Sequence, residues 1–334
     1  MPALNVTRPT LLDVARATDP DGSIAAVGEV LSQTNEVLAD ATWMEGNLVT
    51  GHRSTIRTGY PAATFRKLYG GVQPSKGTVA TIQDTCGELS AYAEIDKRLA
   101  DMAGNANAFR LIEDRAHLEG MNNKFVETLF LGNEAVTPEG FTGFAPRYNS
   151  LSAANGGNIV DGGAAGGQTD ANSIWLVVWD PSTVTCIYPK GMKAGLEVED
   201  KGQVTIQDID GNNGRMEAYA TRYAWHCGLH VKDWRYVVRI ANIDKSTLTK
   251  DAATGADLSD LMFQALRLVP SLNMGRPAFY MSRSMLTFLG RQTANKTASS
   301  TLKAENVGGH LVESFNGIPV RRVDVLAADE ALVS

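Results

Sequence analysis

The order of apolar and polar residues divides the chain into stretches of different character. Residues 1–44 are polar with scattered aliphatic side chains, too few for an independent core, although Asp21 can cap a short helical turn. From Glu45 to Ile95 apolar and polar residues alternate, as in Thr55-Ile56-Arg57-Thr58. We therefore predict an arm that needs a partner surface, followed by a long two-stranded ribbon.

The middle of this ribbon contains several residues that break regular structure. They run from Gly59-Tyr60-Pro61 to Gly70-Gly71-Val72-Gln73-Pro74, with Lys67 and Lys76 among them. We expect the ribbon to project from the body of the protein. An isolated hairpin is at best marginally stable in water, so a projecting one indicates a neighbouring molecule beneath it.

A long amphipathic helix is predicted from Ala106 to Leu131. Asn105 can cap its start, and Gly132-Asn133 supplies a stop. At 1.5 Å per residue it would be about 35–40 Å long. Apolar side chains recur at helical spacing on the face that we expect to be buried, at Leu111, Leu118, Met121, Phe125 and Leu129. The opposite face carries Glu113, Asp114, Glu119 and Lys124.

Glycine pairs mark the next stretch, and β-branched and aromatic runs follow it. Gly156-Gly157, Gly162-Gly163 and Gly166-Gly167 have almost no apolar anchors between them, which predicts a mobile surface loop. Four runs then predict an antiparallel sheet, at Ser173–Trp179, Val184–Tyr188, Tyr219–Trp225 and Trp234–Ile240.

The last third alternates between helix and strand, which is typical of a small α+β unit. The predicted elements are helices at Leu258–Val269 and Ser284–Arg291, and strands at Ala278–Met281 and Pro319–Val323. The predicted organisation is an arm (1–44), a ribbon (45–95), a long helix (96–135), a Gly-rich loop region (136–171), long strands (172–250) and a helix-strand-helix domain (251–334).

Composition narrows the classes of function. With 334 residues, 43% of them hydrophobic, the chain can bury a real core. A net charge of -6 offers no global basic field, which argues against a protein that reads DNA sequence. Three distant cysteines do not resemble the disulfide framework of a secreted domain, and no signal peptide or membrane span is predicted.

Residues with catalytic or metal-binding chemistry do not form a recognisable site. In a strand, His226 and His230 share one face while Cys227 faces away, so at most two metal ligands converge, where a structural zinc ion needs four. The candidate nucleophiles lie outside any known motif; they are Cys86, Cys186, Cys227, Ser282, Ser284 and Ser314.

The glycine-rich and aspartate-rich segments do not indicate a nucleotide-binding or calcium-binding site either. Gly28, Gly70-Gly71 and Gly308-Gly309 do not form a nucleotide-binding pattern. Asp208–Gly214 lacks the full spacing of a calcium loop and is interpreted as a solvated turn. The sequence therefore predicts no catalytic, cofactor-binding or metal-binding residue.

Several segments together resemble the major capsid proteins of tailed bacteriophages, which have the Hong Kong 97 (HK97) capsid fold. The arm, ribbon and long helix match that family's N-arm, E-loop and spine helix in order. The end of the helix and the turn after it, Glu127–Asn133 and Pro138–Phe144, belong to the same match. More specific segments resemble the coat proteins of short-tailed phages of the epsilon-fifteen type; they are Ser173–Trp179, Ile187–Gly191, Ala194–Leu196 and Asp233–Ile243. Together the resemblance covers Ala41 to Asp324.

The segment order departs from the usual pattern of that family. The long strands, Ser173 to Ile243, precede the helix-strand-helix unit at Leu258 to Arg291, whereas in the family they come late. We therefore expect the family architecture with a permuted order of connections.

The resemblance implies a coat protein, not an enzyme, that assembles through pentamers and hexamers into an icosahedral head around double-stranded DNA. It implies a scaffolding protein, a portal at one vertex, a cement protein on the outside and only weak contacts with DNA. The protein would be made in the bacterial cytoplasm and would reside in the virion. Some members of this fold join subunits through a lysine–asparagine bond, which we do not expect at Lys67 or Lys76.

Two other classes of function remain open. A metal-dependent enzyme would use His226 and His230. A β-rich attachment or decoration protein would normally be nearly all β, whereas this chain carries the predicted helix Ala106–Leu131.

Overall fold

The computed structural model describes residues 36–102, 106–164, 170–207, 214–252, 255–295, 302–307, 310–327 and 329–334. These residues form two compact units, which are described separately. Unit 1 contains residues 88–126 and 195–226, and unit 2 contains residues 36–87, 127–194 and 227–334. Most of the predicted arm, the Asn105 cap, Gly28, Gly308-Gly309 and the turn at 208–213 lie outside the described residues.

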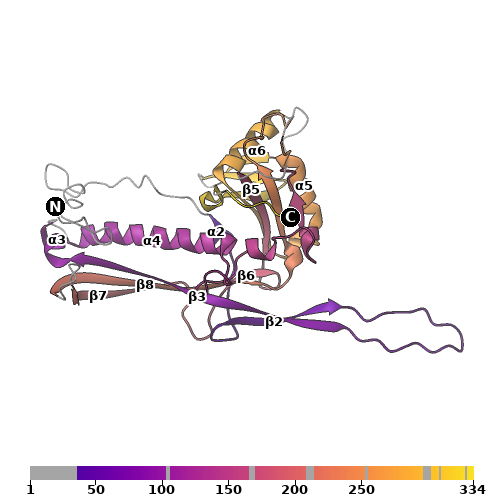
Figure 1. Cartoon of the computed structure of the whole chain (residues 1–334), viewed down its shortest axis with the longest axis horizontal. Helices are drawn as coiled ribbons and strands as arrows, with labels where there is room; N and C mark the ends of the chain where they lie inside the picture. Colours follow the sequence, from indigo (N-terminus) through magenta and orange to yellow (C-terminus); the bar gives the residue numbers. More distant parts are fainter. Residues whose placement is uncertain are drawn as a thin grey trace. The chain divides into compact units, whose positions relative to one another are not determined.

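Unit 1 packs a long helix on antiparallel strands (Figure 1). Its elements, three of which continue into unit 2, are β3 (Thr78–Asp96), α3 (Lys97–Met102), α4 (Ala106–Leu131), β7 (Leu196–Gln207) and β8 (Arg215–Val231). The ring of Phe125 on α4 lies 4.6 Å from that of Trp225 on β8. Arg110 bonds Asp200 on β7 at 2.7 Å and stacks over Tyr219.

Helix α4 has the predicted bounds, and Gly132 follows its last residue as predicted. This position requires glycine, because a Cβ there would lie 2.4 Å from the Thr128 carbonyl oxygen. None of the described helices is long and apolar enough to cross a membrane.

The buried face of α4 was predicted only in part. Met121, Phe125 and Leu129 are buried, but 61% of Leu111 and 36% of Leu118 are exposed. Phe109 explains the difference, because it is buried in a small cluster with residues of β3 and α3. Leu111 lies two residues further on, and two residues rotate a helix by about 200°. The N-terminal half of α4 therefore turns two leucines to the outside.

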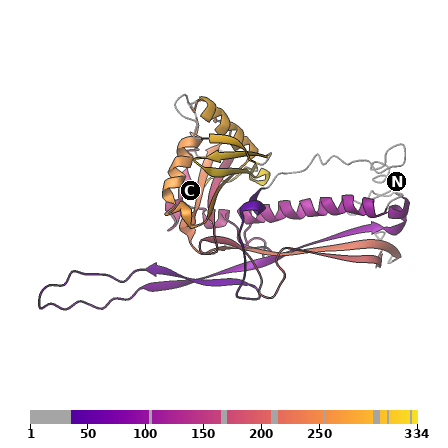
Figure 2. The ribbon, with the colours of Figure 1, turned by 180° about the vertical axis from the view of Figure 1, so that it is seen from behind.

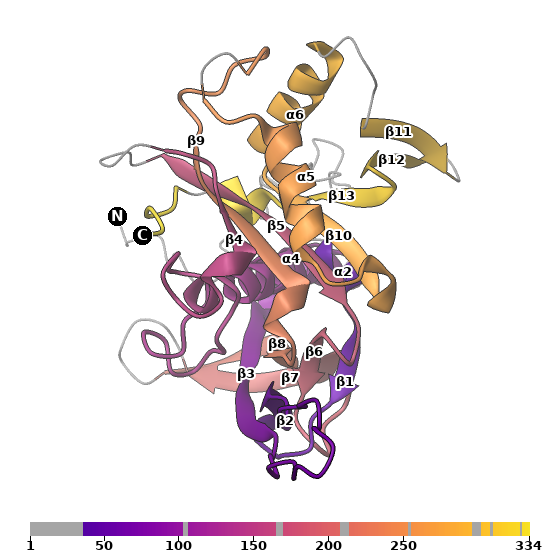
Figure 3. The ribbon, with the colours of Figure 1, turned by 90° about the vertical axis from the view of Figure 1, so that its right-hand side faces the viewer.

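Unit 2 is built on a mixed sheet with helices α5 and α6 against one face (Figure 3). The path of paired strands runs β11-β12-β13-β10-β5-β6-β8-β3-β2, with β1 on β6, β9 on β5 and β4 on β9. The strands not yet introduced are β1 (Trp43–Glu45), β2 (Gly51–Gly59), β4 (Ile159–Asp161), β5 (Ala171–Trp179), β6 (Val184–Tyr188), β9 (Val237–Asp244), β10 (Arg276–Met281), β11 (Leu302–Val307), β12 (His310–Phe315) and β13 (Ile318–Arg322). The helices are α2 (Val37–Asp40), α5 (Leu258–Leu268) and α6 (Arg283–Asn295), with short 3-10 turns η1 (Ala145–Arg147), η2 (Gly156–Asn158), η3 (Trp234–Tyr236), η4 (Leu272–Met274) and η5 (Asp324–Ala327).

Strand β5 is buried at every position, so both faces of the sheet are covered there. Ile174, Leu176 and Val178 point into a hydrophobic core that includes residues of α5 and α6. Trp175 points the other way and lies within 6.1 Å, ring to ring, of Phe130 and of Phe144. A strand that is apolar on both faces can be stable only as a central strand.

The predicted boundary at residue 250 does not follow this sheet. Strand β5 pairs with β9 and also with β10, which belongs to the predicted helix-strand-helix domain. Of the predicted long strands, only the Gly195–His226 segment groups with α4 in unit 1. The prediction of a permuted order assumed that all of these strands pack beside the long helix. The pairing of β5 with β10 contradicts this assumption, because β5 lies inside the sheet of unit 2 with both of its faces covered.

Part of the Gly-rich stretch is ordered and buried, in contrast to the predicted loop. Gly156 and Asn158 are buried in η2, and β4 pairs in parallel with β9. A Cβ at Gly156 would lie 2.0 Å from the Leu151 carbonyl oxygen, and one at Gly162 would lie 2.7 Å from that of Asn242. These glycines therefore allow close approach of two backbones.

The predicted ribbon is confirmed as an antiparallel hairpin of β2 and β3, whose strands run side by side in Figure 2. The pairing extends from Gly51–Thr85 to Gly59–Thr78, with an irregularity between Arg57 and Gly59. Residues 60–77 connect the two strands without helix or strand structure.

Candidate functional site

The connection between β2 and β3, residues 60–77, carries large apolar side chains in water. We call this segment the hairpin tip. Tyr60, Phe65, Leu68, Tyr69 and Val72 each expose between 52% and 106% of their surface. Several large apolar side chains exposed on one short segment are typical of a surface that contacts another molecule. The predicted lysines, Lys67 and Lys76, lie in the same segment and are also exposed.

A shallow groove of about 510 Å³ lies between strand β2 and the loop that precedes β9. Arg57 and Tyr60 line it from the hairpin, and Lys232, Trp234 and Arg235 line it from the loop. The backbone carbonyl of Trp234 accepts a 2.7 Å hydrogen bond from the buried Tyr148 hydroxyl, and this bond holds the loop in place. The groove therefore combines exposed aromatic rings with positive charge.

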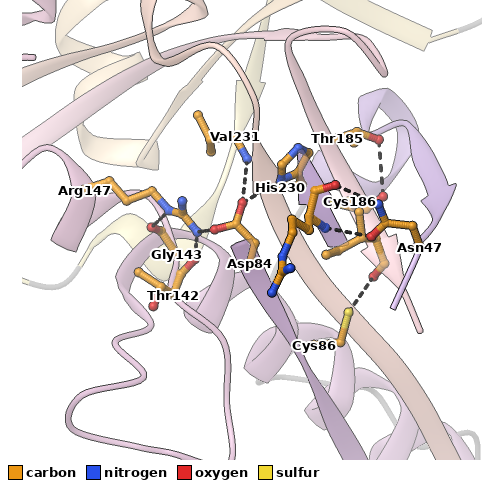
Figure 4. A network of polar contacts seen from close by, with 12 residues as sticks. Asn47, Asp84, Cys86, Thr142, Gly143, Arg147, Thr185, Cys186, His230 and Val231 are labelled. Atoms are coloured by element: carbon orange, nitrogen blue, oxygen red, sulfur yellow. Dashed lines mark hydrogen bonds and ion pairs between the residues drawn. The ribbon is translucent and has the colours of Figure 1, made fainter. Parts of the chain in front are cut away.

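The hairpin is fixed at its base by a buried polar network, shown in Figure 4, which we call the hairpin root. Asp84 on β3 is at its centre. One carboxylate oxygen lies 2.7 Å from Nδ1 of His230 on β8 and accepts a 3.3 Å bond from the Val231 amide. The other oxygen lies 2.9 Å from the guanidinium of Arg147 in η1. Three distant segments therefore meet at one carboxylate.

Two further contacts complete the root. The ring of His52 on β2 lies 4.6 Å from that of His230, edge to face. Arg147 also donates to the carbonyls of Gly143 and Thr142. His230 is fully buried and Asp84 nearly so, whereas Arg147 and His52 are partly exposed, so the carboxylate at the centre of the network is shielded from water.

Burial, hydrogen bonding and charge at the root shift two pKa values. Burial alone would raise the pKa of Asp84, but the hydrogen bond from His230 and the charge of Arg147 lower it below 3.8. The pKa of His52 lies below 6.5 because of burial, then His230 and Lys232, which outweigh the attraction of Asp84. At neutral pH the root therefore holds an ionised Asp84 and a neutral His52.

The three cysteines are free and lie in unit 2. Burial raises the pKa of Cys86 to about 12, and it raises the pKa values of Cys186 and Cys227 as well. A thiol is nucleophilic only as the thiolate, so these side chains react slowly at neutral pH.

The remaining candidate residues have structural positions. Ser282 is buried, and its hydroxyl accepts a bond from the Met285 amide at the start of α6. Ser284 is exposed and Ser314 partly so. His226 lies on β8 within unit 1 and His230 within unit 2. Among the described residues, no three side chains of His, Cys, Asp or Glu gather as metal ligands would.

Sequence reasoning did not single out Asp84 or Arg147. The sequence contains only a weak indication of a role for Asp84. In a strand it shares a face with the apolar Ile82, so its carboxylate would point to the buried side. There is no such indication for Arg147, since it lies in a short turn 63 residues away.

Comparison with known proteins identifies the family. The family model of major capsid protein GP7 matches residues 19–334. The chain belongs to this family of major capsid proteins. A structure of bacteriophage Epsilon15 is 38% identical over all of both chains, with a TM-score of 0.76. The capsid of bacteriophage JBD30 is 9% identical, with a TM-score of 0.51 over 89% of this chain and 93% of that one. No curated protein matches.

The predicted fold and function are confirmed by these findings. The chain is an α+β protein with the HK97-like capsid fold. As a member of the capsid family it is the coat protein of an icosahedral phage head, and it assembles with copies of itself. The hairpin and its root are therefore parts of a shell subunit.

Proposed function

We propose that the hairpin tip is the part of the coat protein that fastens one subunit to the next. The observation that carries the proposal is the set of exposed apolar side chains at Tyr60, Phe65, Leu68 and Tyr69. None of the described residues of unit 2 covers them, and a segment without secondary structure cannot form a core by itself. An adjacent copy provides the cover in the assembled shell.

The energetic argument depends on symmetry. Each buried apolar surface contributes roughly 25 cal/mol per Å², which is modest for one hairpin tip. A closed shell repeats the same contact for every subunit, so many small contacts produce a stable particle. A tip without fixed secondary structure also adapts to neighbours that are not strictly equivalent.

The groove beside β2 supports the same function. Arg57 and Lys232 have no carboxylate partner among the described residues, whereas Arg235 pairs with Asp233 at 2.7 Å. The chain as a whole is acidic, with a net charge of -6. A second copy therefore complements the groove in charge.

The assembly test removes apolar surface from the tip without touching the core. The double variant Phe65→Ser, Tyr69→Ser should fold normally and form few or no shells in electron micrographs. The matched control is Val136→Ser, because Val136 is 78% exposed but lies outside the hairpin. Normal shells from the double variant, with normal yield, would contradict the proposal.

We further propose how the rest of the chain serves the particle. The unit with α5, β10 and α6 would face the axes of pentamers and hexamers, and the N-terminal arm would cross a neighbouring subunit. A scaffolding protein during assembly, a portal at one vertex and an outer cement protein would complete the head.

The charge of the chain bears on its contact with DNA. With a net charge of -6, it would hold packaged DNA by weak, nonspecific contacts. Assembly in the host cytoplasm is consistent with three cysteines that form no disulfide.

A further inference from the structure

The hairpin root contains two histidines in contact, His52 on β2 and His230 on β8. His52 lies directly opposite Asp84 in the pairing of β2 with β3. Its Nδ1 atom is buried without a hydrogen-bond partner, and so is Nε2 of His230. The two rings pack edge to face at 4.6 Å. This contact joins β2 to β8 at the point where the hairpin leaves the sheet.

The titratable and charged groups at the root come from each element packed there: Asp84 from β3, His230 from β8, Lys232 from the loop after β8 and Arg147 from η1. Lys232 opposes a positive charge on His52, whereas Asp84 favours it. Asp84 is the only anion of this set, and its two oxygens already accept from His230, Val231 and Arg147. A proton on His52 therefore adds positive charge near Lys232 and beside a carboxylate that already pairs with Arg147.

We propose that His52 is an acid-sensitive latch for the hairpin. When neutral, it packs on His230 and holds β2 at the root; when protonated, it repels the root and releases β2. The inference rests on the geometry of the subunit and does not depend on what covers the hairpin tip.

The direction of the effect follows from linkage. The pKa of His52 in the closed root lies below the ordinary value of 6.5, so the open root takes up the proton first. The closed root consequently loses stability as the pH falls through about 6.5, and the loss is complete below the lowered pKa. Asp84 is protonated only at lower pH, because its pKa lies below 3.8. Its ion pair with Arg147 therefore persists through the range in which His52 takes up its proton.

Amide hydrogen exchange of the full-length, unassembled subunit tests the latch. Exchange of Gly51–Gly59 would be measured from about pH 7.5 to about pH 5 and corrected for intrinsic exchange at each pH, with Val237–Asp244 as an internal reference. Corrected exchange of β2 should rise several-fold on acidification while β9 stays constant. The rise should be absent in His52→Gln and in His52→Phe, which retains an aromatic ring.

The matched control is His117→Gln, because His117 lies on α4 in unit 1 and should leave the acid response of β2 unchanged. Two results would overturn the proposal. One is a wild-type hairpin whose corrected exchange is constant across this range. The other is an acid response that both His52 variants retain, which would assign the titration to another group.

Discussion

Strand β5 and the hairpin tip are both rich in large apolar residues, but their surroundings are opposite. Every residue of β5 is buried, with α5 and α6 beyond one face and a group of aromatic rings against the other. At the tip, Phe65 and Tyr69 are fully exposed. Apolar side chains in β5 stabilise the subunit, whereas we propose that those at the tip bind a second subunit. On this proposal, the two regions separate residues that maintain the fold from residues that build the shell.

The largest effect on stability is expected in the aromatic layer under β5. Trp175→Ala should lower the free energy of unfolding by about 4–5 kcal/mol, because the cavity left by a fully buried indole cannot collapse. Denaturation followed by circular dichroism measures the loss. A loss below about 1 kcal/mol would mean that this layer is poorly packed.

A buried and an exposed ion pair extend the comparison between covered and uncovered side chains, with a smaller expected change in stability. The Arg239–Glu330 pair of unit 2 is 5% and 8% exposed, and the Arg222–Glu88 pair of unit 1 is 35% and 45% exposed. Glu330→Gln should cost about 3 kcal/mol, because it leaves a buried guanidinium without its counter-charge. Glu88→Gln should cost less than about 1 kcal/mol in the same denaturation experiment. Equal losses would contradict the distinction.

Two adjacent glycines provide a test of backbone packing. Gly156→Ala should cost about 2 kcal/mol, because its Cβ would overlap the Leu151 carbonyl oxygen. Gly157→Ala should change stability by less than about 0.5 kcal/mol, since nothing lies within 4 Å of its Cβ. Thermal melts of the two variants measure the difference, and similar melting temperatures would show that this segment is a loose loop after all.

The smallest effect on stability is expected at the hairpin tip. Phe65→Ser should change the free energy of unfolding of the isolated subunit by less than about 0.5 kcal/mol, because the side chain contacts nothing that folding buries. Denaturation of subunits that are kept unassembled measures this. A loss above about 1 kcal/mol would place Phe65 in the subunit's own core.

The sequence was informative where a pattern is local. The apolar spacing together with the cap and stop residues predicted α4 with its bounds, and the β-branched and aromatic run Ser173–Trp179 predicted the strand that is β5. It was misleading where the partner surface is distant. The exposure of Leu111 depends on where Phe109 packs, and the pairing of β5 with β10 joins segments about a hundred residues apart. No spacing rule connects Asp84, Arg147 and His230, because their contact exists only after the sheet has formed.

The most direct test of the account is the accessibility of Phe65 before and after assembly. In Phe65→Cys, a maleimide should label the new thiol rapidly in unassembled subunits, while the native thiols give little background because burial raises their pKa values, that of Cys86 to about 12. In assembled heads the account predicts labelling of Phe65→Cys that is at least about tenfold slower, as for an opening equilibrium of about 1.4 kcal/mol or more. Equal labelling rates in subunits and heads would contradict the claim that the hairpin tip joins one subunit to the next.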